Sequence, residues 1–196
     1  MRIGTKSILF GAHCFLMHPW FVAAAWWRLF GFPWDLRLWL AFALHDLGYA
    51  GKPNMDGPEG ERHVEWAANL MGRWFGPEWR DFCLYHSRFY AKRDGKPFSR
   101  LCVADKLSIC ITPAWLYLPM VRWTGEIREY MALAKTRTAM GEPKYASMQL
   151  ATGTEERWYA DVQEYLRRWV AEHRDGRADT WTPAQKTARA ASGVWK

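Results

Sequence analysis

The chain has 196 residues, of which 49% are hydrophobic and 24% are charged. This is the composition of one folded domain, and it excludes a largely disordered protein. The net charge of +7 favours an anionic partner, namely a phosphorylated small molecule, a nucleic acid or an anionic membrane. The four cysteines form no CxxC pair and lie in apolar segments, so we expect reduced, buried thiols in a cytoplasmic protein.

The first long apolar stretch, residues 8–27, has no Lys, Arg, Asp or Glu and is long enough for a membrane span. Within it, His18 begins a stripe with the spacing of one helix face. The stripe continues at Val22, Ala25 and Leu29. We therefore predict a buried core helix and no stable membrane insertion, with a span or a signal peptide as the weaker alternatives.

The rest of the chain has helical periodicity nearly throughout. Helices are predicted at residues 36–47, 60–75, 78–89 and 100–111, from 124 past 131, and from 154 onward. Asp35 and Ser99 are the candidate caps of helices 36–47 and 100–111. Gly, Pro, Asn and Asp indicate loops at 50–60, 91–97 and 139–153. With no alternating strand pattern, the sequence predicts an all-α protein with one domain in residues 1–173 and a basic, flexible tail in 174–196.

Six titratable side chains lie at helix-face positions among apolar neighbours. They are His18, His45, Asp46, His63, His86 and Asp105. Any one of them has an ordinary explanation, as a hydrogen-bonded core histidine or a helix cap. Together they would need several separate buried partners, whereas one metal site would satisfy them all. Imidazole and carboxylate suit divalent iron, manganese, cobalt, nickel or zinc.

His45 and Asp46 are adjacent, so on a regular helix their side chains would project about 100° apart. Both can reach one ion only near a helix end, or if Asp46 bridges two ions. A bridging carboxylate holds two ions about 3.5–4 Å apart, where a shared water becomes a nucleophile and a phosphoryl oxygen is bound.

The order of His18, the pair His45-Asp46, and Asp105 resembles the signature of the HD-domain superfamily of metal-dependent phosphohydrolases, which is all-helical. Four segments are similar to successive family segments: HPWFVAAAWWRLFG, LHDLGY, ERHVEWAANLM and YHSRFYAKRDGKPFSRLCVADKLS. They lie within residues 13–110. The resemblance implies a helical bundle of the HD type, to which this chain adds a C-terminal helix and the basic tail.

The resemblance also implies roles for the six side chains. The ligands of a first metal would be His18, His45, Asp46 and Asp105. Asp46 would bridge to a second metal held by His63 and His86. In family members with one metal, the equivalents of the last two histidines bind the substrate or the nucleophilic water, so Asp46, His63 and His86 are the catalytic candidates. His13 competes with His18 as first ligand, but the family's apolar spacing fits His18 better.

The activity that the resemblance implies is that of a nucleotide phosphatase or phosphodiesterase, acting on a nucleotide or related phosphate ester through a metal-bound hydroxide. The candidates for binding phosphate are Arg62, Arg88, Lys106, Lys52 and Arg100. Many family members have Lys directly after the His-Asp turn, where this chain has Tyr49. The Gly-Tyr-Pro triplet of the cyclic-dinucleotide branch is absent, which argues against that substrate.

Two other function classes use the same features. A minority of similar helical proteins hold two irons with the same residue types and oxidise a small organic substrate. A non-catalytic protein could instead bind nucleic acid through its basic surface. A homo-oligomer is compatible with all three.

Overall fold

The computed structural model describes residues 1–139 and 153–174 of the chain. Every regular element in these ranges is a helix, which confirms the all-α prediction. The helices are α1 (Ile3–Phe10), α2 (His18–Phe30), α3 (Leu36–Leu44), the short 3₁₀ turn η1 (Leu47–Tyr49), α4 (Pro58–Glu61), α5 (His63–Phe75), α6 (Pro77–Leu84), α7 (Arg88–Arg93), α8 (Arg100–Ile111), α9 (Ala114–Thr124), α10 (Glu126–Ala139) and α12 (Glu155–His173). The predicted tail and most of the predicted 139–153 connection lie outside the described residues.

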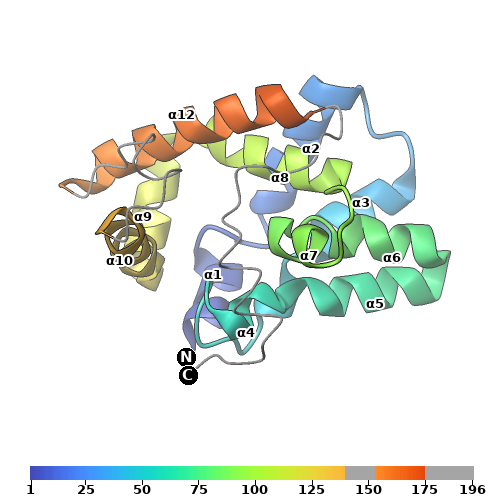
Figure 1. Ribbon diagram of the computed structural model, residues 1–196, viewed down its shortest axis with the longest axis horizontal. Coiled ribbons are helices and arrows are strands. Elements are labelled where there is room, and N and C mark those ends of the chain that lie inside the picture. Colours follow the sequence, from blue (N-terminus) through green and yellow to red (C-terminus); the bar gives the residue numbers. More distant parts are fainter. Residues whose placement is uncertain (140–152, 175–196) are drawn as a thin grey trace.

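Helices α5 and α6 form an antiparallel hairpin, which Figure 1 shows beside α3 and α7. α2 packs on α8, and α12 lies along α8 from the other end of the sequence. The apolar residues between α2, α3, α5 and α8 form the largest core cluster, which includes Val22, Phe42, Val64 and Leu101. The fold therefore brings four segments from the first 111 residues around one centre.

Side-chain caps start several of these helices. Asp35 accepts a hydrogen bond from the Arg37 amide at the start of α3, and Ser99 accepts one from the Cys102 amide at the start of α8, so both predicted caps are confirmed. Thr154 caps α12 in the same way. These caps satisfy main-chain donors that would otherwise have no partner in the first turn.

The helix boundaries differ from the sequence prediction at several points. The apolar stretch 8–27 is divided between α1 and α2, with residues 11–17 as a connection. The predicted helix 60–75 breaks at Arg62, and the predicted helix 78–89 breaks at 85–87, where Ser87 caps the new helix α7. Each of these breaks leaves a buried histidine at or just beyond a helix end, namely His18, His63 and His86.

Helix α9 was not predicted, because its sequence is apolar on several sides and has Pro119 inside it. Among the described residues no single helix is both long and apolar enough to cross a bilayer. Only α8 and α9 taken together reach that length and apolarity, and the chain bends by 102° between them.

The C-terminal helix α12 hydrogen-bonds to the end of α8. Tyr159 donates from its hydroxyl to the carbonyls of Ile109 and Thr112 at 2.9 and 2.8 Å. Gln163 donates to the same two carbonyls at 3.1 and 3.2 Å. The carbonyls at the end of α8 thus accept hydrogen bonds from side chains of α12, about 50 residues later in the chain. These hydrogen bonds hold the end of α8 against α12.

Candidate metal centre

The His-Asp pair lies where α3 stops being a regular helix. α3 ends at Leu44, His45 is its C-terminal cap, and Asp46 precedes the 3₁₀ turn η1. Because the backbone leaves the α-helical path here, the two adjacent side chains converge: His45 Nε2 lies 3.0 Å from Asp46 Oδ2. The helix-end geometry anticipated from the sequence is the one that the structure has.

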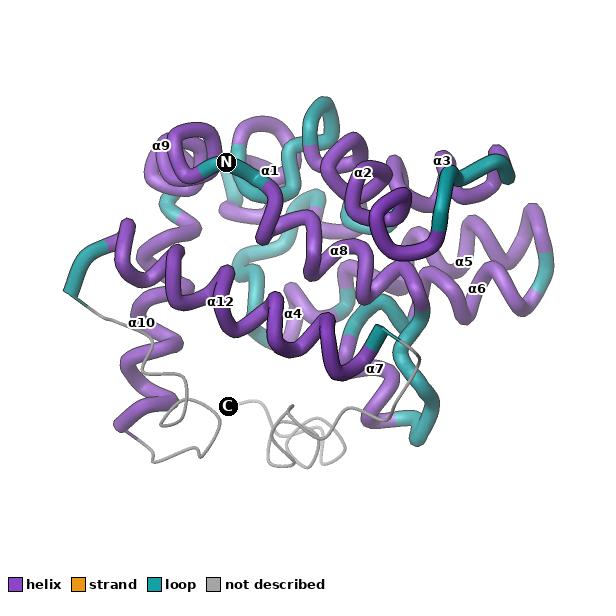
Figure 2. Tube along the Cα trace, turned by 90° about the horizontal axis from the view of Figure 1, so that it is seen from above, coloured by secondary structure: helices purple, strands orange, loops and turns teal. Residues whose placement is uncertain are grey.

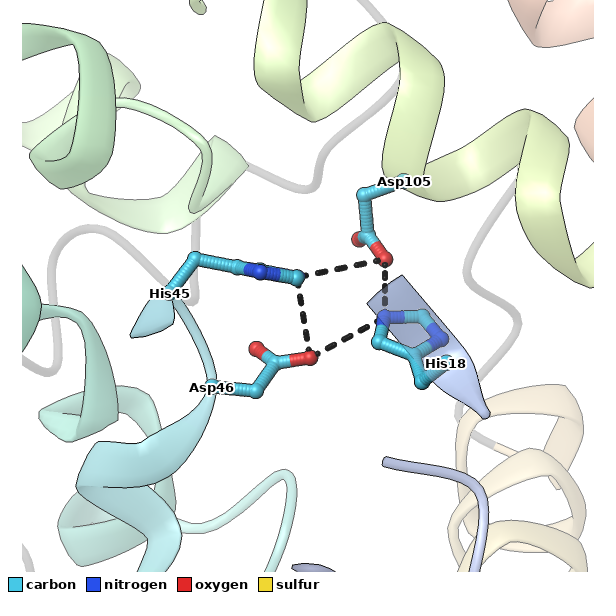
Figure 3. Close-up of side chains that lie close together, drawn as sticks. All are labelled: His18, His45, Asp46 and Asp105. Atoms are coloured by element: carbon cyan, nitrogen blue, oxygen red, sulfur yellow. Dashed lines mark ion pairs between the residues drawn. The ribbon is translucent and has the colours of Figure 1, made fainter. Parts of the chain in front are cut away.

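Four side chains form a first group, drawn in Figure 3. His18, the first residue of α2, has its Nε2 atom 3.2 Å from Asp46 Oδ2 and 3.2 Å from Asp105 Oδ1. His45 Nε2 lies 3.9 Å from the same Asp105 oxygen. All four are buried, and their nearest nitrogen and oxygen atoms lie within 4.8 Å of one another.

Asp46 is also part of a second buried group, with His63 and His86. Its other oxygen, Oδ1, lies 3.5 Å from the Nε2 atom of each of these histidines. Asp46 therefore directs one oxygen toward each group, and the structure brings together all six side chains that the sequence singled out.

The ring orientation of three histidines is set by the main chain. The Nδ1 atoms of His45, His63 and His86 lie 3.0, 2.7 and 2.5 Å from main-chain carbonyls three residues earlier. A carbonyl only accepts, so Nδ1 carries a proton and Nε2 is the ring atom that faces the centre and can bind a metal when it is unprotonated. This is the arrangement that orients histidine ligands in metal sites.

Several of the atoms that face the centre have no hydrogen bond among the described residues. They are His18 Nε2, His45 Nε2 and Asp46 Oδ2, all fully shielded from solvent. Burying polar atoms without a partner costs free energy, and a carboxylate near lone pairs adds repulsion. A divalent cation would accept all of these lone pairs, so the residues present fit a metal ion.

In the metal-free centre, the charge of the carboxylates is balanced by protonation of histidine. Burial alone would raise the pKa of the Asp46 carboxyl, but the neighbouring His45 holds it well below its usual range. For Asp105, burial is likewise outweighed, here by Lys106, and its pKa is also well below normal. Burial would lower the pKa of His45, yet Asp46 and Asp105 raise it to about 10. Without a cation, His45 carries the positive charge that balances the carboxylates.

The histidines of the two groups differ in their pKa shifts. Burial would lower the pKa of His18, but hydrogen bonds to Asp105 and Asp46 raise it. By contrast, burial and the nearby His86 hold the pKa of His63 well below its usual value, so His63 is neutral. A neutral histidine with an inward lone pair is already in the form that binds a metal.

No family model, no curated protein and no solved structure matches the chain. The structure itself shows an all-helical protein with a buried His/Asp cluster that could bind metal. The HD-domain resemblance remains one of sequence motifs.

The five predicted phosphate-binding cations occupy different surroundings. Lys106 contacts the cluster directly, with Nζ 2.8 Å from Asp105 Oδ2. Arg88 donates to the Tyr165 hydroxyl at 2.8 Å and lies over the Trp169 ring. The positive charge of Arg88 slightly opposes the raised pKa of Lys106, which Asp105 causes.

The remaining three candidates are not brought to the cluster by any contact in the described part of the chain. Arg62 is exposed and pairs with Glu65 at 3.0 Å. Arg100 lies over the Phe30 ring. Lys52 follows η1, and its carbonyl accepts from the Gly4 amide.

Tyr49 takes part in the site in a way that the sequence did not indicate. It is buried and stacks on His63, with ring centroids 3.9 Å apart and planes 9° apart. Gly48, the residue before it, passes so close to α5 that a Cβ there would meet the His63 carbonyl oxygen at 1.8 Å. The Gly-Tyr turn therefore positions His63 from two sides.

A second buried network adjoins the cluster and was missed by the sequence analysis. Glu126 is 0% exposed and accepts from Ser7 Oγ at 2.6 Å and Thr124 Oγ1 at 2.5 Å. Ser7 also contacts His13 Nδ1 at 2.8 Å, and the His13 ring lies 5.7 Å from that of His18. Ser7 and Glu126 are 119 residues apart, so no local pattern could have paired them.

Proposed function

We propose that this protein is a metal-dependent phosphohydrolase of the HD type that acts on a nucleotide or a related phosphate ester. The observation that carries the proposal is the orientation of Asp46. Its Oδ2 atom faces His18 and His45, and its Oδ1 atom faces His63 and His86. A carboxylate placed between two sets of imidazole lone pairs is suited to bridging two cations.

Two groups of side chains would hold the metal. One ion would be held by the first group, which contains Asp105, and a second by His63 and His86, with Asp46 shared. Bound divalent ions supply Lewis-acid chemistry, which acidifies water and neutralises charge on phosphoryl oxygens.

The surrounding residues support this role. Asp105 gives its second oxygen to Lys106, which fixes the carboxylate plane and leaves Oδ1 directed at His18. The Nδ1 atoms of His63 and His86 face main-chain carbonyls, so the Nε2 atoms are the ones available to accept a hydrogen bond. If only one metal is bound, these two atoms can orient and deprotonate the attacking water instead.

A phosphate ester suits the cationic side of the cluster. Lys106 contacts Asp105 directly, and the interactions of Arg88 with Tyr165 and Trp169 hold its guanidinium in a defined orientation. Two positioned cations are what binding and neutralising a phosphoryl group require. The choice of a nucleotide rests on the HD-domain resemblance.

The experiment that tests the proposal is elemental analysis of gently purified protein, followed by phosphate release from a panel of nucleotides with added manganese or cobalt. We expect bound transition metal and turnover of at least one phosphate ester. Oxygen consumption with ferrous iron, without phosphate release, would assign the cluster to oxidation. A salt-dependent gel shift with no turnover of any kind would make the protein a nucleic-acid binder.

A further inference from the structure

Exposed aromatic and aliphatic side chains are concentrated in two parts of the chain. Fifteen large hydrophobic residues are exposed in the described residues, and thirteen of them lie in residues 1–44 or in α9. The two exceptions are Trp66 and Trp74 on α5. Scattered exposed apolar residues are normal, but such a concentration marks a binding surface.

These two parts of the chain lie on one side of the molecule. Figure 2 shows α9, α1, α2 and α3 side by side along its upper edge, away from α10, α12 and α7. The α1–α9 contact joins the patch, because the exposed Phe10 and Trp123 rings lie 4.7 Å apart. We call the exposed apolar surface of residues 1–44 and α9 the aromatic face.

The loop between α2 and α3 forms the other end of the aromatic face. Trp34 in this loop is 84% exposed, and Trp27 at the end of α2 is 62% exposed. Both rings pack against Phe32, with centroids 4.5 and 5.7 Å away. Phe32 thus holds both indole rings at the surface.

Charge separates this face from the rest of the protein. Of the 20 acidic residues in the chain, residues 1–44 and α9 contain one, Asp35. Its charge is neutralised by Arg37, with a nitrogen–oxygen distance of 2.6 Å. Arg2, Lys6 and Arg28 add positive charge to the same segments.

We propose that the aromatic face docks the protein onto an anionic membrane surface, with the Trp34 loop entering the headgroup layer. Tryptophan is the side chain that favours this layer, because the indole has a large apolar body and one polar N–H group. A surface that combines such rings with Lys and Arg, and whose one carboxylate is paired with Arg37, is complementary to anionic lipid.

A second copy of the chain fits this face less well. A two-fold interface brings the same patch of both copies together, and this would set their basic side chains against each other with one acidic residue per copy to compensate. An anionic bilayer has no such conflict. The proposal does not depend on the proposed phosphohydrolase activity.

The test is flotation of the full-length protein with vesicles of pure phosphatidylcholine and with vesicles that contain one quarter phosphatidylglycerol. We expect binding to the anionic vesicles, weakened by salt, with a blue shift of tryptophan emission. The double variant Trp27→Ser/Trp34→Ser should lower the bound fraction by about tenfold. Arg28→Gln should weaken binding to the anionic vesicles alone.

The matched control is Trp66→Ser/Trp74→Ser, which removes two exposed tryptophans from α5 and should bind as the wild type does. Circular dichroism shows whether each variant is folded. The proposal is overturned if the wild type floats with neither vesicle, or if the control loses as much binding as the Trp27/Trp34 variant. It is also overturned if the wild type is a dimer that the Trp27/Trp34 variant converts to a monomer with no lipid binding in either form.

Discussion

The Nε2 atoms of His63 and His86 lie 3.1 Å apart, and the Nδ1 atom of each ring faces a main-chain carbonyl. The two Nε2 atoms therefore face each other across a hydrogen-bond distance, an arrangement that needs a proton or a cation between the rings. A bound cation would be coordinated by both atoms.

His86→Ala should therefore reduce the bound metal from two equivalents toward one and lower phosphohydrolase activity. The first group of ligands remains complete in this variant, so one ion should stay. Elemental analysis and activity measured on the same preparation check this. A wild type that holds one ion, with no change in the variant, would contradict the two-metal arrangement.

Asp46→Ala should abolish both metal retention and turnover while the protein still folds. Asp46 is the residue common to both groups, so its loss removes one ligand from each, and metal affinity should fall by more than about a hundredfold. Asp81→Ala, which changes a half-buried carboxylate on α6 that pairs with Arg80, is the control and should retain metal. Full activity in the Asp46 variant would place the reaction elsewhere.

Metal affinity should rise with pH through the neutral range. In the metal-free protein the carboxylates raise the pKa of His45 from 6.5 to about 10. The ion pair that protonated His45 makes with the carboxylates therefore stabilises the metal-free fold fully at pH values below about 6.5. This stabilisation is lost as the pH rises through the folded-state pKa of about 10. A metal must displace this proton, so affinity should increase about tenfold per pH unit for each proton released. Calorimetry in buffers of different ionisation enthalpy counts these protons, and pH-independent binding would exclude His45 as a ligand.

Gly48→Ala should damage the centre without touching a ligand. The added methyl would meet the His63 carbonyl oxygen at 1.8 Å, and this backbone atom can move only with α5. We expect a loss of about 3 kcal/mol in the free energy of unfolding, together with weaker metal binding. Ala50→Ser, at an exposed position two residues later, should change neither quantity.

The Glu126 network should make part of the stability depend on pH. Burial alone would raise the pKa of this carboxyl, but hydrogen bonds from His13, Ser7 and Thr124 lower it below 4.5. The Glu126 carboxylate therefore stabilises the fold fully at pH values above about 4.5. This stabilisation is lost as the pH falls through the lower pKa that Glu126 has in the folded protein. Relative to Glu126→Gln, the wild type should be more stable by about 2 kcal/mol at neutral pH.

Denaturant unfolding at several pH values measures this difference. The gap between the wild type and Glu126→Gln should narrow under acid conditions, because the glutamine does not titrate. A constant gap across the acid range would show that the charge of Glu126 contributes nothing to stability.

Local sequence patterns were sufficient for some features and insufficient for others. The Asp35 and Ser99 caps and the α12 helix follow from short-range signals, and they are where the sequence placed them. The six titratable side chains could be grouped because each stood out against apolar neighbours, and the structure brings them together. Helix α9 lacked a clear polar face, so periodicity could not reveal it.

Interactions between distant residues had no such signal. The contact of Lys106 with Asp105 could be anticipated from adjacency, but the Ser7–Glu126 hydrogen bond and the Arg88–Tyr165 hydrogen bond join residues far apart in the chain. The stacking of Tyr49 on His63 depends on how η1 packs against α5, and that is a property of the folded chain.

The hydrogen bonds from α12 to the end of α8 set a lower limit on the size of an active fragment. A truncation after residue 139 would retain every proposed ligand, yet it would remove Tyr159 and Gln163 and leave the carbonyls of Ile109 and Thr112 without these donors. Asp105 lies on that same helix, one turn earlier. The region that bears the motifs is therefore not a minimal catalytic unit, and dissection of this protein has to preserve its last described helix.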